Sequence, residues 1–419
     1  MGLKVFKFGG ASIKDANSVK NVASILKRLS DQKILVVISA MGKITNSLEK
    51  LTDAFLFKQE DLPTIVNEIK KYHFDIIEKL FPNISNPVYA DIHAVFAELE
   101  KYVRHTPSNL QAKEYDQLVS FGEIISSKIV NAYLQESGLI STWIDAREVI
   151  KTDSTYREGQ VDWEKTTQLS TALLKGEGIS LTQGFIGRTP DNFTTTLGRE
   201  GSDYTAAILA YCTDAESVTI WKDVPGVMNA DPKWFDGTKL IQQMSYQDAI
   251  ELSYYGATVI HPKTIKPLQN KNIPLYVRSF NHPEEKGTII NDKGSSLPIP
   301  CFIFKIDQLL LSISPKDFSF IAEENFSDIF KTFAEHGVKI NVMQNSAISF
   351  SVCMDNDKRK TPELIKTLQK KFRVLYNENV ELITIRYYNQ FTIDRVCIGK
   401  KVFMEHKSRY TVQLVAKNI

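Results

Sequence analysis

Two glycine-containing loops, each expected between a strand and a helix, constrain the fold of this chain more than any other feature. The first is KFGGAS at Lys7–Ser12, which follows an alternating, β-prone segment. The second is TLGREGSDYTAA at Thr196–Ala207, where Gly198 and Gly201 precede an apolar helical run. Glycine lets the backbone approach an anion closely, and free N–H groups at the start of a helix point toward it. Each loop therefore predicts half of a phosphate-binding site.

The side chains around the two loops fit an anion site. Lys7 adds positive charge to the first loop, and Arg199 and Asp203 stand in the second. Ser202 is predicted as the N-cap of the helix that follows. A strand–Gly–Gly–helix turn also recurs in α/β proteins for purely structural reasons, so neither loop alone implies a function. The two loops together indicate one.

Composition excludes several classes of partner. The chain is 43% hydrophobic and 24% charged with a formal net charge of +2, which gives no sign of a nucleic-acid or membrane surface. Small molecules are the expected partners. The first residues lead into a strand without an apolar leader, so a cytoplasmic location is expected. The histidines show no zinc-binding spacing, and the cysteines are expected to be reduced core residues: Cys212, Cys301, Cys353 and Cys397.

The order of predicted elements indicates the fold class. At 419 residues the chain exceeds one comfortable core and should form more than one domain. Strands and helices alternate up to the linker-like residues 291–300, which predicts an α/β sandwich on a mainly parallel sheet. After the linker, a β-α-β-β-α-β order predicts a ferredoxin-like α+β domain. In this interpretation, residues 1–295 form the first domain and residues 301–419 the second.

Six motifs carry a resemblance to a known family. In chain order they are KFGGAS, VVISAMGKITNSL, SFGE, TTTLGREGSDYTAA, WKDVPGVMNADP and YYGATVIHPKTIKPL. They resemble the motifs of aspartate kinases, which have the amino acid kinase fold. The segment after the linker is similar to an ACT regulatory domain. The resemblance implies a catalytic domain over 1–295 and an ACT-like domain over 301–419, with its second ACT module truncated.

The resemblance also implies a reaction. Aspartate kinases transfer the γ-phosphoryl group of ATP to the side-chain carboxylate of L-aspartate, giving 4-phospho-L-aspartate. This is the first step of lysine, threonine and methionine biosynthesis. Mg²⁺ normally bridges the phosphates in such chemistry. The implied partners are L-aspartate and ATP, an amino-acid effector, and further copies of the chain in a homodimer or larger homo-oligomer.

The motifs assign roles to individual residues. Lys7 resembles the residue that binds the transferring phosphoryl oxygens, and Asp203 the carboxylate that holds the catalytic cations in place. The residues that match the family's substrate contacts are Ser39, Thr45, Glu123 and Arg199. The residues that match or border its ATP contacts are Lys7, Gly9, Gly10, Gly201, Ser202, Lys222, Asp223, Met228, Lys233 and Thr258.

The chain departs from the family pattern at several of these positions. Glu200 replaces a small residue beside the phosphate loop, and Met228 replaces a tyrosine of the nucleotide turn. Most consequential is Thr258, which stands where a lysine is usual near the phosphates. We expect Lys222 or Lys263 to supply the missing positive charge.

The effector site is also altered. The VKINVMQNSAISFSV segment matches the strand–loop–strand that binds an effector amino acid, with Asn341 and Ser346 as its expected polar contacts. Ala347 stands where an acidic residue often sits, so a lysine effector would lose a countercharge. We therefore expect weak or absent inhibition by lysine, and a domain retained mainly to pair edge strands across a homodimer.

Two alternatives stay open at this point. One is a kinase for a different acidic amino acid, which the ACT-like segment and the DVPG turn disfavour. The other is a catalytically weakened regulator that binds an amino acid. Thr258 favours the regulator, whereas the joint presence of Lys7, Arg199 and Asp203 disfavours it.

Overall fold

The computed structural model describes residues 2–29, 31–59, 61–171, 178–235, 237–257, 260–295, 298–317 and 319–419. The chain forms two compact units. The first comprises Met1–Val227, Leu240–Ile250 and Thr258–Ser295; the second comprises Met228–Lys239, Glu251–Ala257 and Ser296–Ile419. The passage from Ser295 to Ser296 falls within the predicted linker, and two shorter segments before it also belong to the second unit.

The first unit is built on an eight-stranded sheet. In spatial order its strands are β3 (Ser141–Ile144), β4 (Ile179–Gln183), β2 (Ile34–Ile38), β1 (Lys4–Phe8), β7 (Ser217–Lys222), β9 (Leu275–Ser279), β10 (Thr288–Asn291) and β8 (Gln243–Ser245). Only the β9–β10 pair is antiparallel among these described pairings. The central strand β2 is the fully buried run ILVVI, as expected for a parallel strand covered on both faces. The prediction of a mainly parallel α/β sandwich is confirmed.

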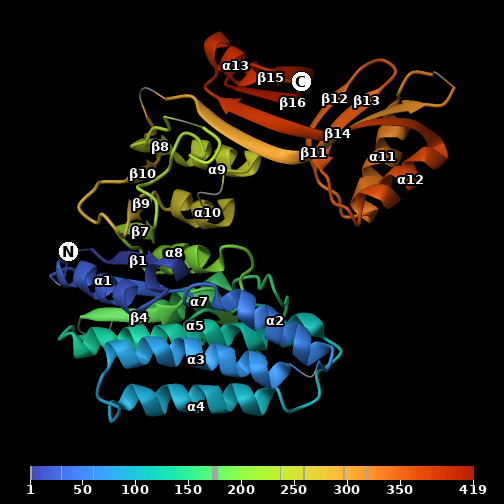
Figure 1. The fold of residues 1–419 in the computed structure, drawn as a ribbon. Helices are drawn as coiled ribbons and strands as arrows, with labels where there is room; N and C mark the ends of the chain where they lie inside the picture. The colour runs from blue at the N-terminus through green and yellow to red at the C-terminus, as the bar shows by residue number, and fades with distance from the viewer. Residues whose placement is uncertain are drawn as a thin grey trace. The chain divides into compact units, whose positions relative to one another are not determined.

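Helices cover the eight-stranded sheet of the first unit. They are α1 (Ala16–Lys27), α2 (Ile44–Leu56), α3 (Leu62–Leu80), α4 (Pro87–Tyr102), α5 (Gln111–Glu136), α6 (Ala146–Val149), α7 (Trp163–Ser170), α8 (Gly201–Cys212), α9 (Tyr246–Tyr255, whose second half belongs to the second unit) and α10 (Pro262–Asn270). Helices α5, α3 and α4 lie one beyond another on one side of the sheet (Figure 1). Their apolar faces join one core with α1 and α2. A short hairpin, β5 (Ile186–Arg188) with β6 (Thr194–Thr196), completes the unit.

The second unit contains a six-stranded sheet in the order β12-β13-β11-β14-β16-β15. Its elements after the linker are β11 (Cys301–Pro315), α11 (Glu323–Glu335), β12 (Ile340–Asn345), β13 (Phe350–Asp355), α12 (Thr361–Lys371), β14 (Phe372–Arg386), α13 (Gln390–Cys397), β15 (Lys400–Lys407) and β16 (Thr411–Asn418). The first six follow the predicted β-α-β-β-α-β order.

The two long strands β11 and β14 shape the second unit. Each is 15 residues long, and they run side by side (Figure 1). Their pairing register shifts near Gln308, where Asp307 adopts a left-handed φ of 54°. One end of the pair joins β12 and β13, and the other joins β16 and β15. The β11–β14 pair is therefore shared by two sub-sheets, one with β12 and β13 and the other with β16 and β15.

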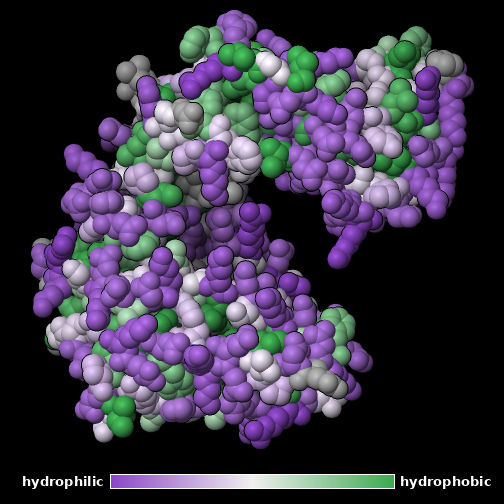
Figure 2. Space-filling model, in the orientation of Figure 1, coloured by the Kyte–Doolittle hydropathy of each residue, from purple (hydrophilic) through white to green (hydrophobic). Residues whose placement is uncertain are grey.

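Hydrophilic side chains dominate the face seen in Figure 2, with apolar residues scattered among them. Among the described residues, no helix combines the length and apolar composition that crossing a bilayer requires.

Candidate active site

A cavity of about 670 Å³ lies in the first unit. It opens where β1, β2 and β7 end and where α8 begins, the usual position of ligand sites in parallel sheets. The structure brings together at this cavity the following predicted site residues: Lys7, Gly9, Gly10, Ser39, Thr45, Glu123, Arg199, Gly201, Ser202, Asp203, Lys222 and Asp223.

The charged centre of the cavity is a triad of side chains. Lys7 Nζ lies 2.6 Å from Asp203 Oδ1, and Lys222 Nζ lies 3.7 Å from Asp203 Oδ2. Only 4% of the Asp203 side chain and 11% of the Lys7 side chain are exposed. Burial alone would raise the pKa of Asp203, but the two ammonium groups outweigh burial and hold that pKa below its usual value. Asp203 therefore stays ionised and fixes both lysines in place.

Both glycines of the first turn are required by close neighbours. A Cβ at Gly9 would stand 3.2 Å from Lys7 Nζ, so glycine leaves the ammonium room. A Cβ at Gly10 would stand 2.6 Å from the Gly42 carbonyl oxygen, so Gly10 is needed for packing against the loop after β2. The turn continues into a 3₁₀ turn at Gly10–Ile13, and α1 begins only at Ala16. The expected α-helical N-terminus therefore does not face the first loop.

The second loop has a different cap from the predicted one. Helix α8 begins at Gly201 with Glu200 as its N-cap, so the assignment of Ser202 as N-cap was wrong. Glu200 has a left-handed φ of 54°, and its Oε2 accepts a hydrogen bond of 2.9 Å from the His261 backbone N–H. This bond fixes the loop to the segment before α10. His261 itself caps α10, because its Nδ1 accepts a hydrogen bond from the Lys263 N–H.

Glu123 is a buried carboxyl group at the cavity wall. It lies on α5, and its Oε1 accepts from the Ala40 N–H at 3.3 Å, while its Oε2 has no hydrogen-bond partner among the described residues. Burial raises the pKa of Glu123 to about 8, although nearby Lys7 opposes the rise. The unpartnered oxygen can accept a hydrogen bond from a cationic ligand.

Several residues that line the cavity were not predicted from the sequence: Tyr115, Arg157, Glu158, Phe185, Thr196 and Trp221. A buried carboxylate beneath them, Asp116, organises part of this wall. Its Oδ2 accepts from the Arg157 and Thr196 N–H groups at 2.8 and 2.9 Å, and its Oδ1 accepts from Thr196 Oγ1 at 2.7 Å. Asp116, Arg157 and Thr196 lie far apart in the sequence, so no local sequence pattern reveals that Asp116 binds the other two residues.

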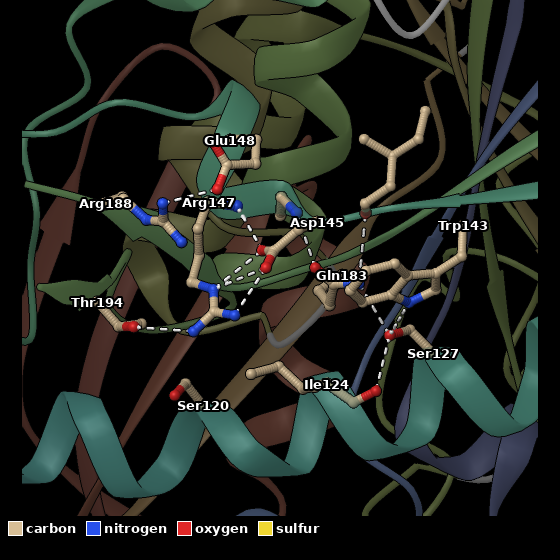
Figure 3. A network of polar contacts seen from close by, with 12 residues as sticks. Ser120, Ile124, Ser127, Trp143, Asp145, Arg147, Glu148, Gln183, Arg188 and Thr194 are labelled. Carbon is tan, nitrogen blue, oxygen red and sulfur yellow. Dashed lines mark hydrogen bonds and ion pairs between the residues drawn. The ribbon is translucent and has the colours of Figure 1, made fainter. Parts of the chain in front are cut away.

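A polar network supports the β5–β6 hairpin on the same wall (Figure 3). The Arg147 guanidinium binds the Asp145 carboxylate and reaches Thr194 Oγ1 at 3.5 Å. Gln183, at the end of β4, donates to Ser127 Oγ on α5 at 2.9 Å. The network ties strand ends to α5 and so holds the cavity wall in one position.

Other predicted residues lie elsewhere. Met228 and Lys233 belong to the second unit and do not line this cavity, and Thr258 lies outside the described residues. In the second unit, the Asn341 side chain accepts from Lys305 Nζ and donates to Gln308 Oε1 and to Asp355 Oδ1. Ser346 pairs with Ser349 in the turn between β12 and β13. These polar groups are therefore occupied by protein partners.

Comparisons with known proteins agree with the fold and the cavity. Residues 2–279 match the sequence model of the amino acid kinase family. The lysine-sensitive aspartokinase 3 of Escherichia coli strain K12 is 30% identical over 414 residues, which cover 95% of this chain and 90% of that protein. Two crystal structures of E. coli aspartokinase III are similar in fold to this chain. The one with aspartate and ADP has a TM-score of 0.81 at 27% identity, covering 99% of this chain and 96% of that one. The one with lysine and aspartate has a TM-score of 0.83 at 26% identity, covering 99% and 95%. The chain therefore belongs to the amino acid kinase family and, within it, to the ATP-dependent aspartokinases.

Proposed function

We propose that the cavity transfers the γ-phosphoryl group of ATP to the side-chain carboxylate of L-aspartate, with Lys7 and Asp203 at its centre. The observation that carries the proposal is the buried Lys7–Asp203–Lys222 triad beside the first glycine turn. A carboxylate that attacks a phosphoryl group needs no covalent protein intermediate. It needs two anions held in line and positive charge where negative charge develops. The triad supplies that charge in a low-dielectric setting.

On the phosphoryl side, Lys7 stabilises the transferring group and Lys222 a neighbouring phosphate. Lys222 thus takes the role that a lysine at Thr258 would have filled. Lys263 also lies near the second loop, because its Nζ would stand 3.6 Å from a Cβ at Gly198. Lys222 is the better candidate, since it lines the cavity and Lys263 does not.

Mg²⁺ fits this site as a companion of the nucleotide. Among the described residues, no three His, Cys, Asp or Glu side chains gather into a ready metal cage. Mg²⁺ in phosphoryl-transfer sites is typically bound by one or two carboxylates together with substrate phosphates. Asp223 lines the cavity and is exposed, so its carboxylate is the group that would hold the ion. When bound, the ion neutralises phosphate charge.

On the substrate side, Arg199 binds the α-carboxylate of aspartate and Glu123 receives the ammonium group. An arginine suits a carboxylate because its planar fork donates two parallel hydrogen bonds. Glu123 suits the ammonium because its Oε2 lacks a described partner. Ser39 and Thr45, at the end of β2 and the start of α2, line the same wall and supply hydroxyl groups.

A hydroxylamine trap tests this function. Acyl phosphates react with hydroxylamine to give a coloured hydroxamate, so the assay reports the product directly. With ATP and Mg²⁺, we expect hydroxamate from L-aspartate and at least tenfold less from L-glutamate or N-acetyl-L-glutamate. A higher rate with either of the other acids would move the assignment to a different acidic substrate. ATP-dependent binding of aspartate without any hydroxamate would favour the weakened regulator.

The second unit is proposed to be an ACT-like regulatory domain over 301–419 that binds an amino-acid effector and joins copies of the chain. The support is its β-α-β-β-α-β order, together with the lysine-bound structure of the E. coli relative. The two sub-sheets on β11 and β14 are consistent with one complete module and one shorter one. Sedimentation of the purified chain tests the oligomer.

A further inference from the structure

Arg157 is an exposed arginine that the surrounding structure holds against the cavity wall. Its backbone has a left-handed φ of 67°, which is unfavourable for arginine. The Asp116 carboxylate fixes this conformation by accepting from the Arg157 N–H at 2.8 Å. The guanidinium carbon lies 3.9 Å from the centre of the Tyr115 ring, a stacked cation–π contact. Two independent contacts therefore fix the position of one side chain.

The neighbours of Arg157 place it on the substrate side of the cavity. Tyr115 Oη donates to Glu49 Oε1 at 2.8 Å, and Glu49 lies on α2. Thr45 stands four residues before Glu49, on the same face of that helix. The chain of contacts from Arg157 through Tyr115 thus leads to the helix face that carries a predicted substrate hydroxyl.

The guanidinium also retains free binding capacity. Among the described residues, no carboxylate lies at ion-pair distance from the Arg157 guanidinium, whose carbon lies over the Tyr115 ring, so the positive charge of Arg157 has no protein countercharge there. An arginine stacked on an aromatic ring is pre-organised, so it loses little conformational entropy when it binds an anion. An arginine that is only solvated at the surface needs no such fixed side-chain position, so the position of Arg157 points to a ligand.

We propose that Arg157 is a second carboxylate-binding residue, which holds the α-carboxylate of aspartate together with Arg199. This inference rests on the proposed function. In the reaction, the side-chain carboxylate must approach the phosphoryl group at Lys7. The α-carboxylate then stays unreacted on the opposite side and needs its own countercharge. Arg157 supplies that charge, which makes it a determinant of selectivity for an acid with a free α-carboxylate.

The test compares two substrates and two variants. L-Aspartic acid α-amide retains the side-chain carboxylate but lacks the α-carboxylate charge. Arg157→Gln removes the guanidinium charge, and Arg157→Gly removes the side chain while suiting the left-handed backbone, so it protects the fold. Arg28→Gln, on the exposed C-terminal end of α1, is the matched control for loss of one positive charge. Hydroxamate kinetics and thermal melting are measured for each protein.

Both Arg157 variants should raise the KM for L-aspartate on the order of 10- to 100-fold, the range for a lost charge-assisted hydrogen bond, and leave the KM for ATP within twofold. With the α-amide, wild type and variants should differ less than twofold in kcat/KM. If the amide is not turned over, its inhibition constant against aspartate gives the same comparison.

Two results would overturn the inference. One is a KM for aspartate within twofold of wild type in Arg157→Gly. The other is an equal loss with both substrates, which would indicate a structural role. Absence of hydroxamate from the wild-type protein is a separate outcome, because it would refute the proposed function and with it the substrate on which this inference depends.

Discussion

At the scale of single residues, Lys7 is the group on which the proposed chemistry depends most. If its ammonium stabilises charge that develops on the phosphoryl group, Lys7→Ala should lower turnover on the order of 10²–10³-fold, as loss of one pre-organised donor does elsewhere. Lys4→Ala is the matched control, because Lys4 lies on the same strand and does not line the cavity. Turnover of Lys7→Ala within threefold of wild type would refute the role.

Lys7 also has a structural duty. It pairs with the Asp203 carboxylate, and only 4% of that side chain is exposed. Removing one partner of a buried pair leaves an uncompensated charge. A melting measurement beside the kinetics therefore separates lost chemistry from lost folding, and Lys222 should preserve part of the stability.

Glu123 makes substrate binding depend on pH. With a pKa of about 8, the carboxyl is mostly protonated in the free protein at pH 7, whereas the ammonium of aspartate requires the ionised form. The KM for aspartate should therefore fall about tenfold or more between pH 6.5 and 8.5. Glu123→Gln should bind aspartate more weakly and lose this trend. An identical trend in the variant would assign it to another group.

The same residue should affect stability with a definite sign. The pKa of Glu123 is higher in the folded protein than its ordinary value of 4.5, so the folded state binds more protons between those values. Its contribution to stability is full below pH 4.5 and is lost as the pH rises to about 8. The urea midpoint of Glu123→Gln relative to wild type should therefore increase from pH 5 to pH 8.5. A constant difference would contradict the raised pKa.

At the scale of elements, the start of α8 shows where sequence patterns succeed and fail. The glycines correctly predicted a loop before the helix, because their positions reflect local backbone needs. The cap could not be predicted, because Glu200 gains its stability from the N–H of His261, far along the chain. The local N-cap preference favours Ser202, whereas the tertiary hydrogen bond to His261 favours Glu200 at this position.

Substitutions at Glu200 test this explanation. Glu200→Ala keeps the left-handed strain of about 1 kcal/mol and loses the hydrogen bond to His261. Glu200→Gly loses the same bond but relieves the strain, so it should be the more stable of the two in urea unfolding. If alanine proves equal to glycine or better, residue 200 does not have the left-handed backbone conformation.

The long strands of the second unit illustrate another limit. The β-α-β-β-α-β order predicted a strand at the position of β11 and another at the position of β14, without their lengths. Their full length of 15 residues depends on pairing with β13 and β16 at opposite ends. Pairing between distant segments leaves no mark in local periodicity, so the sequence order alone does not reveal these lengths.

At the scale of the whole molecule, the sequence predicted the catalytic fold and most of the polar groups of the cavity, because motif residues sit at strand ends that a parallel sheet gathers at one edge. It did not predict Tyr115, Arg157 or Asp116. Tyr115 and Asp116 lie on α5 and Arg157 lies in a distant turn, at positions that none of the six motifs covers, and only the folded chain brings them together at the cavity wall.

Regulation is also a property of the whole molecule. The Asn341 amide is engaged by Lys305, Gln308 and Asp355, and Ala347 offers no countercharge for a cationic effector. Lysine should therefore inhibit weakly or not at all. Initial rates measured against L-lysine check this, and half-inhibition below about 1 mM, equivalent to more than about 4 kcal/mol of binding, would contradict it.

The proposed reaction requires that a side-chain carboxylate oxygen attack the γ-phosphorus in this cavity. The most direct measurement uses L-aspartate labelled with ¹⁸O in its side-chain carboxylate and traps the product with hydroxylamine, which attacks the acyl carbon and releases phosphate. Phosphorus NMR should show one ¹⁸O atom in each released phosphate, in an amount equal to the hydroxamate formed. Unlabelled phosphate released at the same rate would contradict the proposed reaction, because the oxygen would then have come from water.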